Sequence, residues 1–232
     1  MREYHAKLLA LRDLAPEVRH FVFEVAETDR VQFAPGQFVS VTERIAGKEI
    51  TRAYSIASPP DGKRIELCLN RVAEGLVSPH LFDLRPGDCV RVSEPLGHFV
   101  PRDPLGDSVF VATGTGIAPI RSMLHHVLRA GTGKHLTLLF GARHAAGLLY
   151  RQEFERLALE HRNFLFLPTL SRPGDQWRGR RGHVQVHLDE ALGGARDVDV
   201  YLCGLRTMVD DVRAQLKRRC LDRQRIIYEK YD

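Results

Sequence analysis

The chain has 232 residues, of which 44% are hydrophobic and 27% charged, as in a soluble globular protein with one large domain or two smaller ones. No run reaches the roughly 20 apolar residues of a membrane span, and no signal peptide is recognisable, so we expect a cytoplasmic protein. The four cysteines stand far apart with no C-x-x-C pair, which argues against a zinc or iron–sulfur site.

The net charge of +5 is unevenly distributed. Of the 34 Lys and Arg and 29 Asp and Glu residues, 14 and 15 lie up to Pro104, which leaves 20 and 14 after it. The positive excess therefore belongs to the second half. Because no basic stripe interleaved with aromatic residues accompanies it, we do not expect a nucleic-acid partner.

The first hundred residues read as short strands separated by turn signals such as Ala34-Pro35-Gly36 and Arg85-Pro86-Gly87-Asp88. The expected strands are residues 5–11, 18–25, 37–42, 52–57, 65–70 and 89–93. Their close spacing predicts an antiparallel β-barrel over residues 1–100. One helix, residues 79–84, interrupts them, and Ser78 is its expected N-cap.

From residue 105 onward, strands alternate with helices. The expected strands are residues 109–112, 136–140, 164–167, 198–202 and 225–228, and the expected helices are residues 117–129, 150–161, 184–192 and 206–219. This βα alternation predicts a Rossmann-like α/β domain over residues 105–232, with a five-stranded parallel sheet.

A glycine turn, Gly114-Thr115-Gly116, joins the first strand of this second domain to its helix. Glycine has no Cβ, so the backbone can approach a bulky anion, and the helix start points free N–H groups over the turn. The arrangement suits a phosphate or pyrophosphate. Taken alone, a Gly-x-Gly turn is equally ordinary as a βα connection.

Two features of the first domain could also hold a nucleotide. In Arg52-Ala53-Tyr54-Ser55, a period of two sends Arg52 and Tyr54 to the same face, where a guanidinium and a ring could bind a nucleotide-bearing flavin. Taken alone, these four residues are better explained as a plain exposed strand with one routine arginine. The segment Gly75-Leu76-Val77-Ser78-Pro79 is a second anion site or a simple helix cap.

Together with further motifs, these segments resemble the ferredoxin–NADP reductase family, and most of all its bacterial ferredoxin/flavodoxin reductases. The motifs occur in family order over nearly the whole chain. They are Pro35-Gly36-Gln37-Phe38, Arg52-x-Tyr54-Ser55, Gly75-x-x-Ser78-Pro79, Gly114-Thr115-Gly116-Ile117-Ala118-Pro119 and Cys203-Gly204-x-x-x-Met208.

The resemblance implies an FAD-binding barrel followed by an NADP-binding domain. In the barrel it assigns Arg52 to the FAD pyrophosphate, Tyr54 to the isoalloxazine and Ser55 to its reactive N5, with Ala53 as a further cofactor-binding position. The remaining cofactor-binding positions are Gly75, Val77 and Ser78 for the flavin, and Thr113, Gly114, Thr115, Gly116, Gly204 and Met208 for the nicotinamide nucleotide.

Three further residues are expected to act at the reacting centre. Cys203 would orient the nicotinamide, although a thiol at the end of a buried strand is also commonly a small apolar group. Glu229 would assist proton movement, and Tyr231 would cover the flavin face opposite Tyr54. The chain departs from the family pattern here, because Asp232 follows the expected terminal ring.

Preference for NADPH is expected from three arginines that match family positions. They are Arg143, Arg172 in the pair Ser171-Arg172, and Arg180, all in loops after parallel strands. Guanidinium groups bind the two oxygens of a 2′-phosphate well. Any one of these arginines alone is better explained as a solvated loop residue, and only the three together at family positions favour phosphate binding.

We therefore expect an FAD-dependent reductase that exchanges a hydride with NADPH and single electrons with an acidic ferredoxin or flavodoxin. Three alternatives remain open at this point. One is a free-flavin reductase, a second is an NADH-dependent reductase component of an oxygenase or other electron-transfer complex, and a third is a non-catalytic nucleotide-sensing module.

Overall fold

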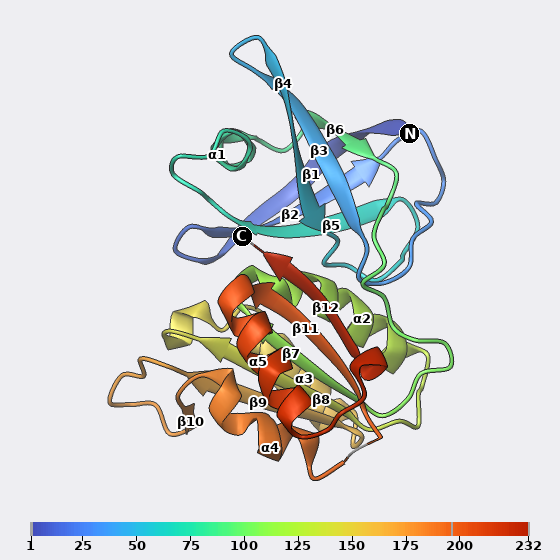
Figure 1. Ribbon diagram of the computed structural model, residues 1–232. Helices are drawn as coiled ribbons and strands as arrows, with labels where there is room; N and C mark the ends of the chain where they lie inside the picture. The colour runs from blue at the N-terminus through green and yellow to red at the C-terminus, as the bar shows by residue number, and fades with distance from the viewer. Residues whose placement is uncertain (1, 196, 232) are drawn as a thin grey trace.

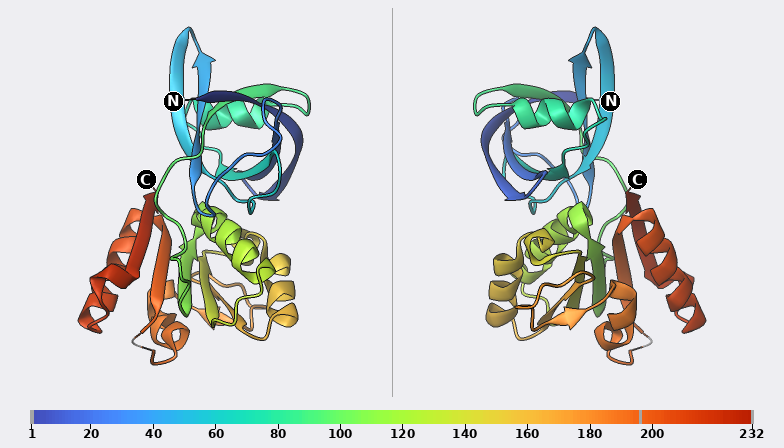
Figure 2. Two further views of the ribbon diagram at one scale, coloured as in Figure 1. Left: turned by 90° about the vertical axis from the view of Figure 1, so that its right-hand side faces the viewer. Right: turned by 90° about the vertical axis from the view of Figure 1, so that its left-hand side faces the viewer.

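The structure is a computed structural model that describes residues 2–195 and 197–231, so Asp232 lies outside the described residues. It places a β-barrel against an α/β domain, and the C-terminal strand ends at the boundary between them (Figures 1 and 2). Among the described helices, none is long and apolar enough to cross a membrane.

The first domain is a six-stranded antiparallel sheet in the order β4-β3-β6-β1-β2-β5. The chain that leaves β4 bridges from Ile56 to Leu67 of β5, which curls the sheet into a barrel. The strands are β1 (Glu3–Ala15), β2 (Val18–Val25), β3 (Phe38–Ile45), β4 (Lys48–Ser55), β5 (Arg64–Asn70) and β6 (Cys89–Ser93).

Alternation builds the barrel core, because Phe21, Phe23 and Val25 of β2 point inward while their neighbours do not. Helix α1 (Val77–Asp83) packs beside β4. The expectation that Ser78 caps this helix is wrong. Ser78 lies inside the first turn, and its hydroxyl accepts a hydrogen bond of 3.0 Å from the Val72 N–H, folding the preceding loop.

The second domain is a parallel sheet in the order β10-β9-β8-β7-β11-β12. Its strands are β7 (Ser108–Thr113), β8 (Leu136–Ala142), β9 (Phe164–Leu170), β10 (Arg180–Arg181), β11 (Asp199–Leu205) and β12 (Ile226–Tyr231). The expected count of five strands is wrong, since β10 is a sixth that pairs with the end of β9. Two charged residues carry no periodicity from which a strand could be predicted.

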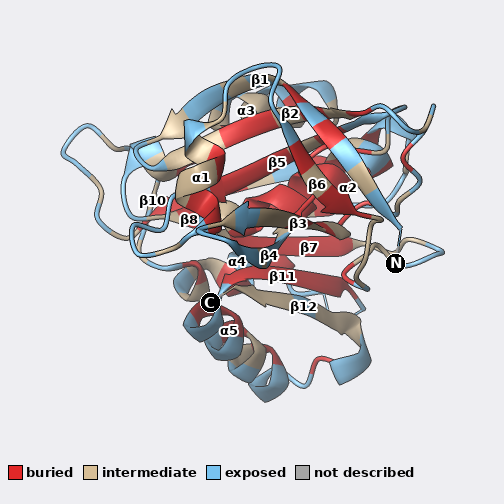
Figure 3. Ribbon diagram, turned by 90° about the horizontal axis from the view of Figure 1, so that it is seen from above, coloured by how far each residue is buried: buried red, intermediate tan, exposed pale blue. Residues whose placement is uncertain are grey.

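Helices cover both faces of this sheet. Phe110 and Ala112 of β7 face α2 (Ile117–Arg129) and α3 (Arg151–Glu160), whereas Val109 and Val111 face α4 (Leu188–Leu192) and α5 (Arg206–Arg218). The central strands β7 and β11 are therefore buried along most of their length (Figure 3). The expected helix over residues 184–192 divides into the 3₁₀-helix η3 (Val184–His187) followed by α4.

Candidate functional site

Strand β4 carries a cation and an aromatic ring close together, on Arg52 and Tyr54, which we call the β4 row. Arg52 is exposed, and within the described residues its guanidinium makes one hydrogen bond, from Nη1 to the Thr51 carbonyl at 2.8 Å. Tyr54 is half-buried against the barrel core, and burial raises its pKa to about 12. Ala53 lies between them, exposed. The remaining N–H donors of Arg52 are thus available for a ligand.

The loop before α1 is folded tightly onto itself. The Gly75 N–H donates to the Val72 carbonyl at 2.8 Å, and a Cβ built on Gly75 would lie 3.0 Å from that oxygen. This close approach explains the glycine. Val77 and Ser78 follow at the buried first turn of α1, whose leading N–H groups have no helical partner.

Across the domain boundary, β12 places two side chains on the end of β4. Ser55 Oγ donates to Glu229 Oε1 at 3.1 Å and lies 2.5 Å from the Tyr231 hydroxyl. Cys203 is the strand neighbour of Glu229 and is fully buried. Burial raises the pKa of Glu229, although the hydrogen bond from Ser55 lowers it in part. Burial also raises the pKa values of Cys203 and Tyr231 well above their usual range.

The four residues expected at the reacting centre therefore converge, although they come from three strands that are far apart in the sequence. Ser55 belongs to the barrel, whereas Cys203, Glu229 and Tyr231 belong to the α/β domain. A hydroxyl that donates to a half-buried carboxylate provides a route for a proton at Glu229 Oε1.

The glycine turn forms the 3₁₀-helix η1 (Gly114–Gly116) at the start of α2. Gly114 has a φ of +56°, in the left-handed region that favours glycine. Gly116 is helical instead, and it is needed because a Cβ there would collide with the Cys203 carbonyl. A Cβ on Gly204 would likewise collide with Thr113 Oγ1, so the turn and the end of β11 approach without side chains between them.

A cavity of about 830 Å³ opens beside this turn. Six of the expected site residues line it: Thr113, Gly114, Arg143, Ser171, Arg172 and Met208. Two buried polar atoms of its lining residues, Thr113 Oγ1 and Gln185 Oε1, have no hydrogen-bond partner within the described part of the chain. A buried polar atom without a partner is costly, so these atoms favour a polar ligand in the cavity.

Two of the three expected arginines lie at this cavity. The Arg172 N–H donates to the Arg143 carbonyl at 2.8 Å, which holds the two loops together. Both side chains are exposed, and over residues 2–195 and 197–231 neither guanidinium makes a hydrogen bond or ion pair. Arg180 does not line the cavity, because its guanidinium binds the Glu190 carboxylate through Nε at 2.7 Å and through Nη2.

Part of the cavity wall was not predicted from the sequence. Ala15, Pro16 and Val18, at the tip of the β1–β2 hairpin, reach from the barrel to the cavity in the other domain. A small apolar turn carries no functional signal, and only the packing of the two domains brings it there. The cavity is therefore built by both domains.

The residues present fit two dinucleotides. Arg52, Tyr54 and the loop at Gly75 suit a flavin dinucleotide on the barrel, and the cavity with its two free arginines suits a second nucleotide on the α/β domain. Ser55, Glu229 and Tyr231 lie at the boundary where such ligands would meet.

Comparison with known proteins agrees with this division. Residues 5–100 match the family model of the oxidoreductase FAD-binding domain, and residues 110–214 match that of the oxidoreductase NAD-binding domain. A crystal structure of an Amycolatopsis cytochrome P450 reductase has a TM-score of 0.89 and 32% identity, covering 99% of this chain and 69% of that one.

Among curated relatives, Ferredoxin–NADP reductase B of Sorangium cellulosum is 43% identical over 99% of this chain and 98% of its own length. The reductase component of phenol 2-monooxygenase from a Pseudomonas species is 33% identical over 100% of this chain. The chain covers only 66% of that relative, just under two thirds of its length. The chain belongs to the ferredoxin–NADP reductase family and is an FAD-dependent NAD(P)H oxidoreductase.

Proposed function

We propose that this enzyme is a ferredoxin or flavodoxin reductase that prefers NADPH to NADH. The observation that carries the proposal is the cavity at the end of the parallel sheet, where the guanidinium groups of Arg143 and Arg172 have no hydrogen-bond or ion-pair partner among the described residues. Bound FAD would supply the redox chemistry, because a flavin can accept one hydride, with its two electrons, from a nicotinamide and release the electrons one at a time. The chain supplies binding, orientation and proton handling.

FAD would be held by the barrel. Arg52 and the first turn of α1, with Val77 and Ser78, would bind its pyrophosphate, while Tyr54 would support its ring system. A charge-assisted hydrogen bond to phosphate contributes about 1.5 to 3 kcal/mol, so Arg52 is the main anchor in this proposal.

At the reacting centre, Ser55 and Glu229 would hold a proton between them. The Ser55 hydroxyl already donates to Glu229 Oε1, and burial favours protonation of that carboxyl. Tyr231 would lie over the flavin, and Cys203, packed behind Gly116, would help to orient the nicotinamide. The convergence of these groups from both domains supports a hydride transfer at the domain boundary.

The 2′-phosphate of NADPH would be bound by Arg143 and Arg172, with Ser171 beside them. Two free guanidinium groups at one cavity suit a dianion. Arg180, which we also expected to bind this phosphate, could do so only by leaving Glu190, so the structure lends it no support.

The electron acceptor is proposed to be a separate acidic protein of the ferredoxin or flavodoxin type. The residues after Pro104 carry 20 basic and 14 acidic side chains, an excess that would steer a negatively charged partner. Salt screens such steering, with a screening length of about 8 Å at physiological ionic strength. Added salt should therefore slow electron transfer to a ferredoxin far more than reduction of ferricyanide, and equal slowing would contradict the proposed acceptor.

A second candidate is an NADH-dependent reductase component of an oxygenase. The similarity to the phenol 2-monooxygenase reductase component and to a cytochrome P450 reductase favours it, as does the pairing of Arg180 with Glu190. The deciding experiment is an anaerobic titration of the yellow, desalted protein with NADPH and with NADH, followed by flavin absorbance. Faster reduction by NADH would favour this candidate over the proposed function.

A further inference from the structure

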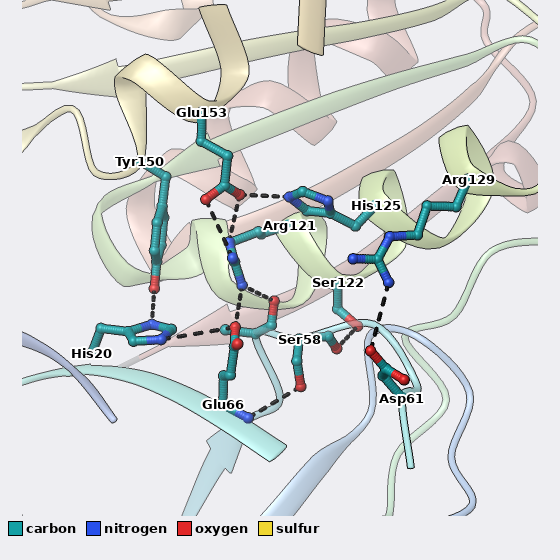
Figure 4. A network of polar contacts seen from close by, with 11 residues as sticks. His20, Ser58, Asp61, Glu66, Arg121, Ser122, His125, Arg129, Tyr150 and Glu153 are labelled. Atoms are coloured by element: carbon teal, nitrogen blue, oxygen red, sulfur yellow. Dashed lines mark hydrogen bonds and ion pairs between the residues drawn. The ribbon is translucent and has the colours of Figure 1, made fainter. Parts of the chain in front are cut away.

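Two hydrogen bonds connect the helix that starts at the nucleotide turn with the segment that follows the flavin strand (Figure 4). Arg121 Nη1, on α2, donates to the Ala57 carbonyl at 2.8 Å, and Ser122 Oγ donates to the Ser58 carbonyl at 2.6 Å. All four residues are buried. The two cofactor-binding elements are thus joined by direct contacts inside the domain boundary.

The Arg121 guanidinium is held rigidly on its own side of the boundary. Glu153 of α3 accepts from Nε at 2.6 Å and from Nη2 at 3.2 Å, a bidentate arrangement. The guanidinium also stacks over the Tyr150 ring at 4.7 Å. On the barrel side, Glu66 of β5 accepts from Nη1 at 2.6 Å. Arg121 therefore uses four of its five N–H donors in a fixed orientation.

The path through Arg121 between the two binding elements is short. Arg121 lies four residues, or about 6 Å, along α2 from Ile117, which follows the glycine turn. Ala57 lies two residues after Ser55 on the barrel chain. Figure 2 shows α2 directly beneath the barrel. A displacement of α2 at Arg121 would therefore move the nucleotide turn relative to Ser55 by a similar amount.

Hydride transfer is sensitive to such a displacement, because the reacting atoms must lie about 3 to 3.5 Å apart and an error of 1 Å can cost a factor of about 100 in rate. A buried ion pair adds little net stability compared with well-packed apolar side chains, but it can specify one arrangement. Glu66, Arg121 and Glu153 form such ion pairs at the domain contact, both at 2.6 Å.

We propose that Arg121, together with Ser122 and Glu66, is a positioning residue for hydride transfer. These residues fix the distance between the nucleotide on the α/β domain and the flavin on the barrel, and they touch neither ligand. The inference rests on the proposed function, since it requires hydride transfer across the domain boundary.

The test compares three variants with the wild-type holoenzyme. Glu66→Gln removes one charge at the boundary, Ser122→Ala removes one bond across it, and Arg121→Lys keeps the charge but loses the planar fork. The control is Glu160→Gln, which removes an exposed ion pair with Arg156 inside α3, at 3.6 Å. For each protein, FAD content, the NADP⁺ dissociation constant and the anaerobic rate of flavin reduction at saturating NADPH are measured.

The flavin reduction rate should fall at least tenfold in Arg121→Lys and about threefold in Glu66→Gln and Ser122→Ala. FAD content and NADP⁺ affinity should stay within twofold of wild type, and the control should match wild type throughout. If Arg121→Lys does not fold, the two milder variants decide. Wild-type rates in the folded variants, or rate losses matched by equal losses of NADP⁺ affinity, would overturn the inference.

The same data separate this inference from the proposed function. A wild-type holoenzyme whose flavin neither NADPH nor NADH reduces would refute both. Reduction by NADH alone would refute only the NADPH preference, and the ratio of variant to wild-type rate, measured with NADH, would still decide the role of Arg121.

Discussion

Replacing Arg172 by alanine should lower the use of NADPH selectively. Its guanidinium lies exposed at the cavity, with no hydrogen bond or ion pair to the described residues, whereas the Arg172 backbone N–H holds the loop by donating to the Arg143 carbonyl. Alanine keeps that N–H. The substitution therefore removes a ligand contact and leaves the loop in place.

The size of the expected effect follows from the strength of a single hydrogen bond between a guanidinium and a phosphate. Such a charge-assisted bond contributes about 1.5 kcal/mol, and about 1.4 kcal/mol is tenfold in affinity. Arg172→Ala should therefore reduce kcat/KM for NADPH about tenfold, or more if both phosphate oxygens are bonded. NADH lacks the 2′-phosphate, so its kcat/KM should change less than threefold.

Arg180→Ala is the matched control, because Arg180 follows a neighbouring loop but binds Glu190. Steady-state ferricyanide reduction with each nucleotide gives kcat/KM for wild type and both variants. Arg180→Ala should lower NADPH use less than Arg172→Ala does. If Arg172→Ala loses both nucleotide activities equally, or if wild type prefers NADH, the assignment of this cavity to a 2′-phosphate is refuted.

Three further outcomes are expected. Arg52→Ala should give a folded, largely flavin-free protein, and purification with full flavin occupancy would show that the β4 row does not bind FAD. Cys203→Ser should keep FAD but slow flavin reduction, since a hydroxyl replaces a buried thiol behind the proposed nicotinamide site. The third outcome concerns stability and pH. Burial lowers the pKa of His20 from 6.5 to about 4. Burial alone would raise the pKa of Glu153, but its contacts with His125 and Arg121 lower that pKa to about 2. In both cases the unfolded state binds its proton at a higher pH than the folded state does. The free energy of unfolding linked to His20, about 3 kcal/mol, should therefore be lost as the pH falls from 6.5 towards 4. The free energy of unfolding linked to Glu153 should be lost as the pH falls from 4.5 towards 2. Urea unfolding of His20→Gln should show a weaker pH dependence between 6.5 and 4 than wild type, and identical profiles would contradict this.

Most strands of both sheets were predictable from the sequence because strands such as β2, β7 and β11 bury alternate or continuous apolar residues. The exceptions have physical reasons. Strand β10 has only Arg180 and Arg181, and it exists because the end of β9 offers unpaired backbone groups. The N-cap assignment of Ser78 was wrong because the helix begins one residue earlier, at Val77, and the Ser78 hydroxyl bonds instead to the Val72 N–H of the preceding loop.

The candidate site was predictable in parts. Family motifs located the β4 row, the glycine turn and Cys203, and strand order alone placed Arg143 and Arg172 at one edge of the sheet. The pairing of Arg180 with Glu190 was not predictable, because it depends on how α4 packs after a 3₁₀ turn. The contribution of Pro16 to the cavity depends on the contact between domains, which no local pattern encodes.

The sequence of helix α2 does contain a signal for the contact between the two domains. Eight consecutive residues, from Ile117 to Leu124, are buried, although one apolar stripe is enough to cover a single sheet. The additional buried face carries polar residues, Arg121 and Ser122, and further along the helix Arg129 lies 4.0 Å from Asp61 of the barrel. A polar stripe beside the apolar one would ordinarily be interpreted as a solvent-exposed face. Here the barrel covers it, so the motifs proposed to bind each cofactor define two half-sites, and in our proposal the distance between them depends on residues that belong to neither motif.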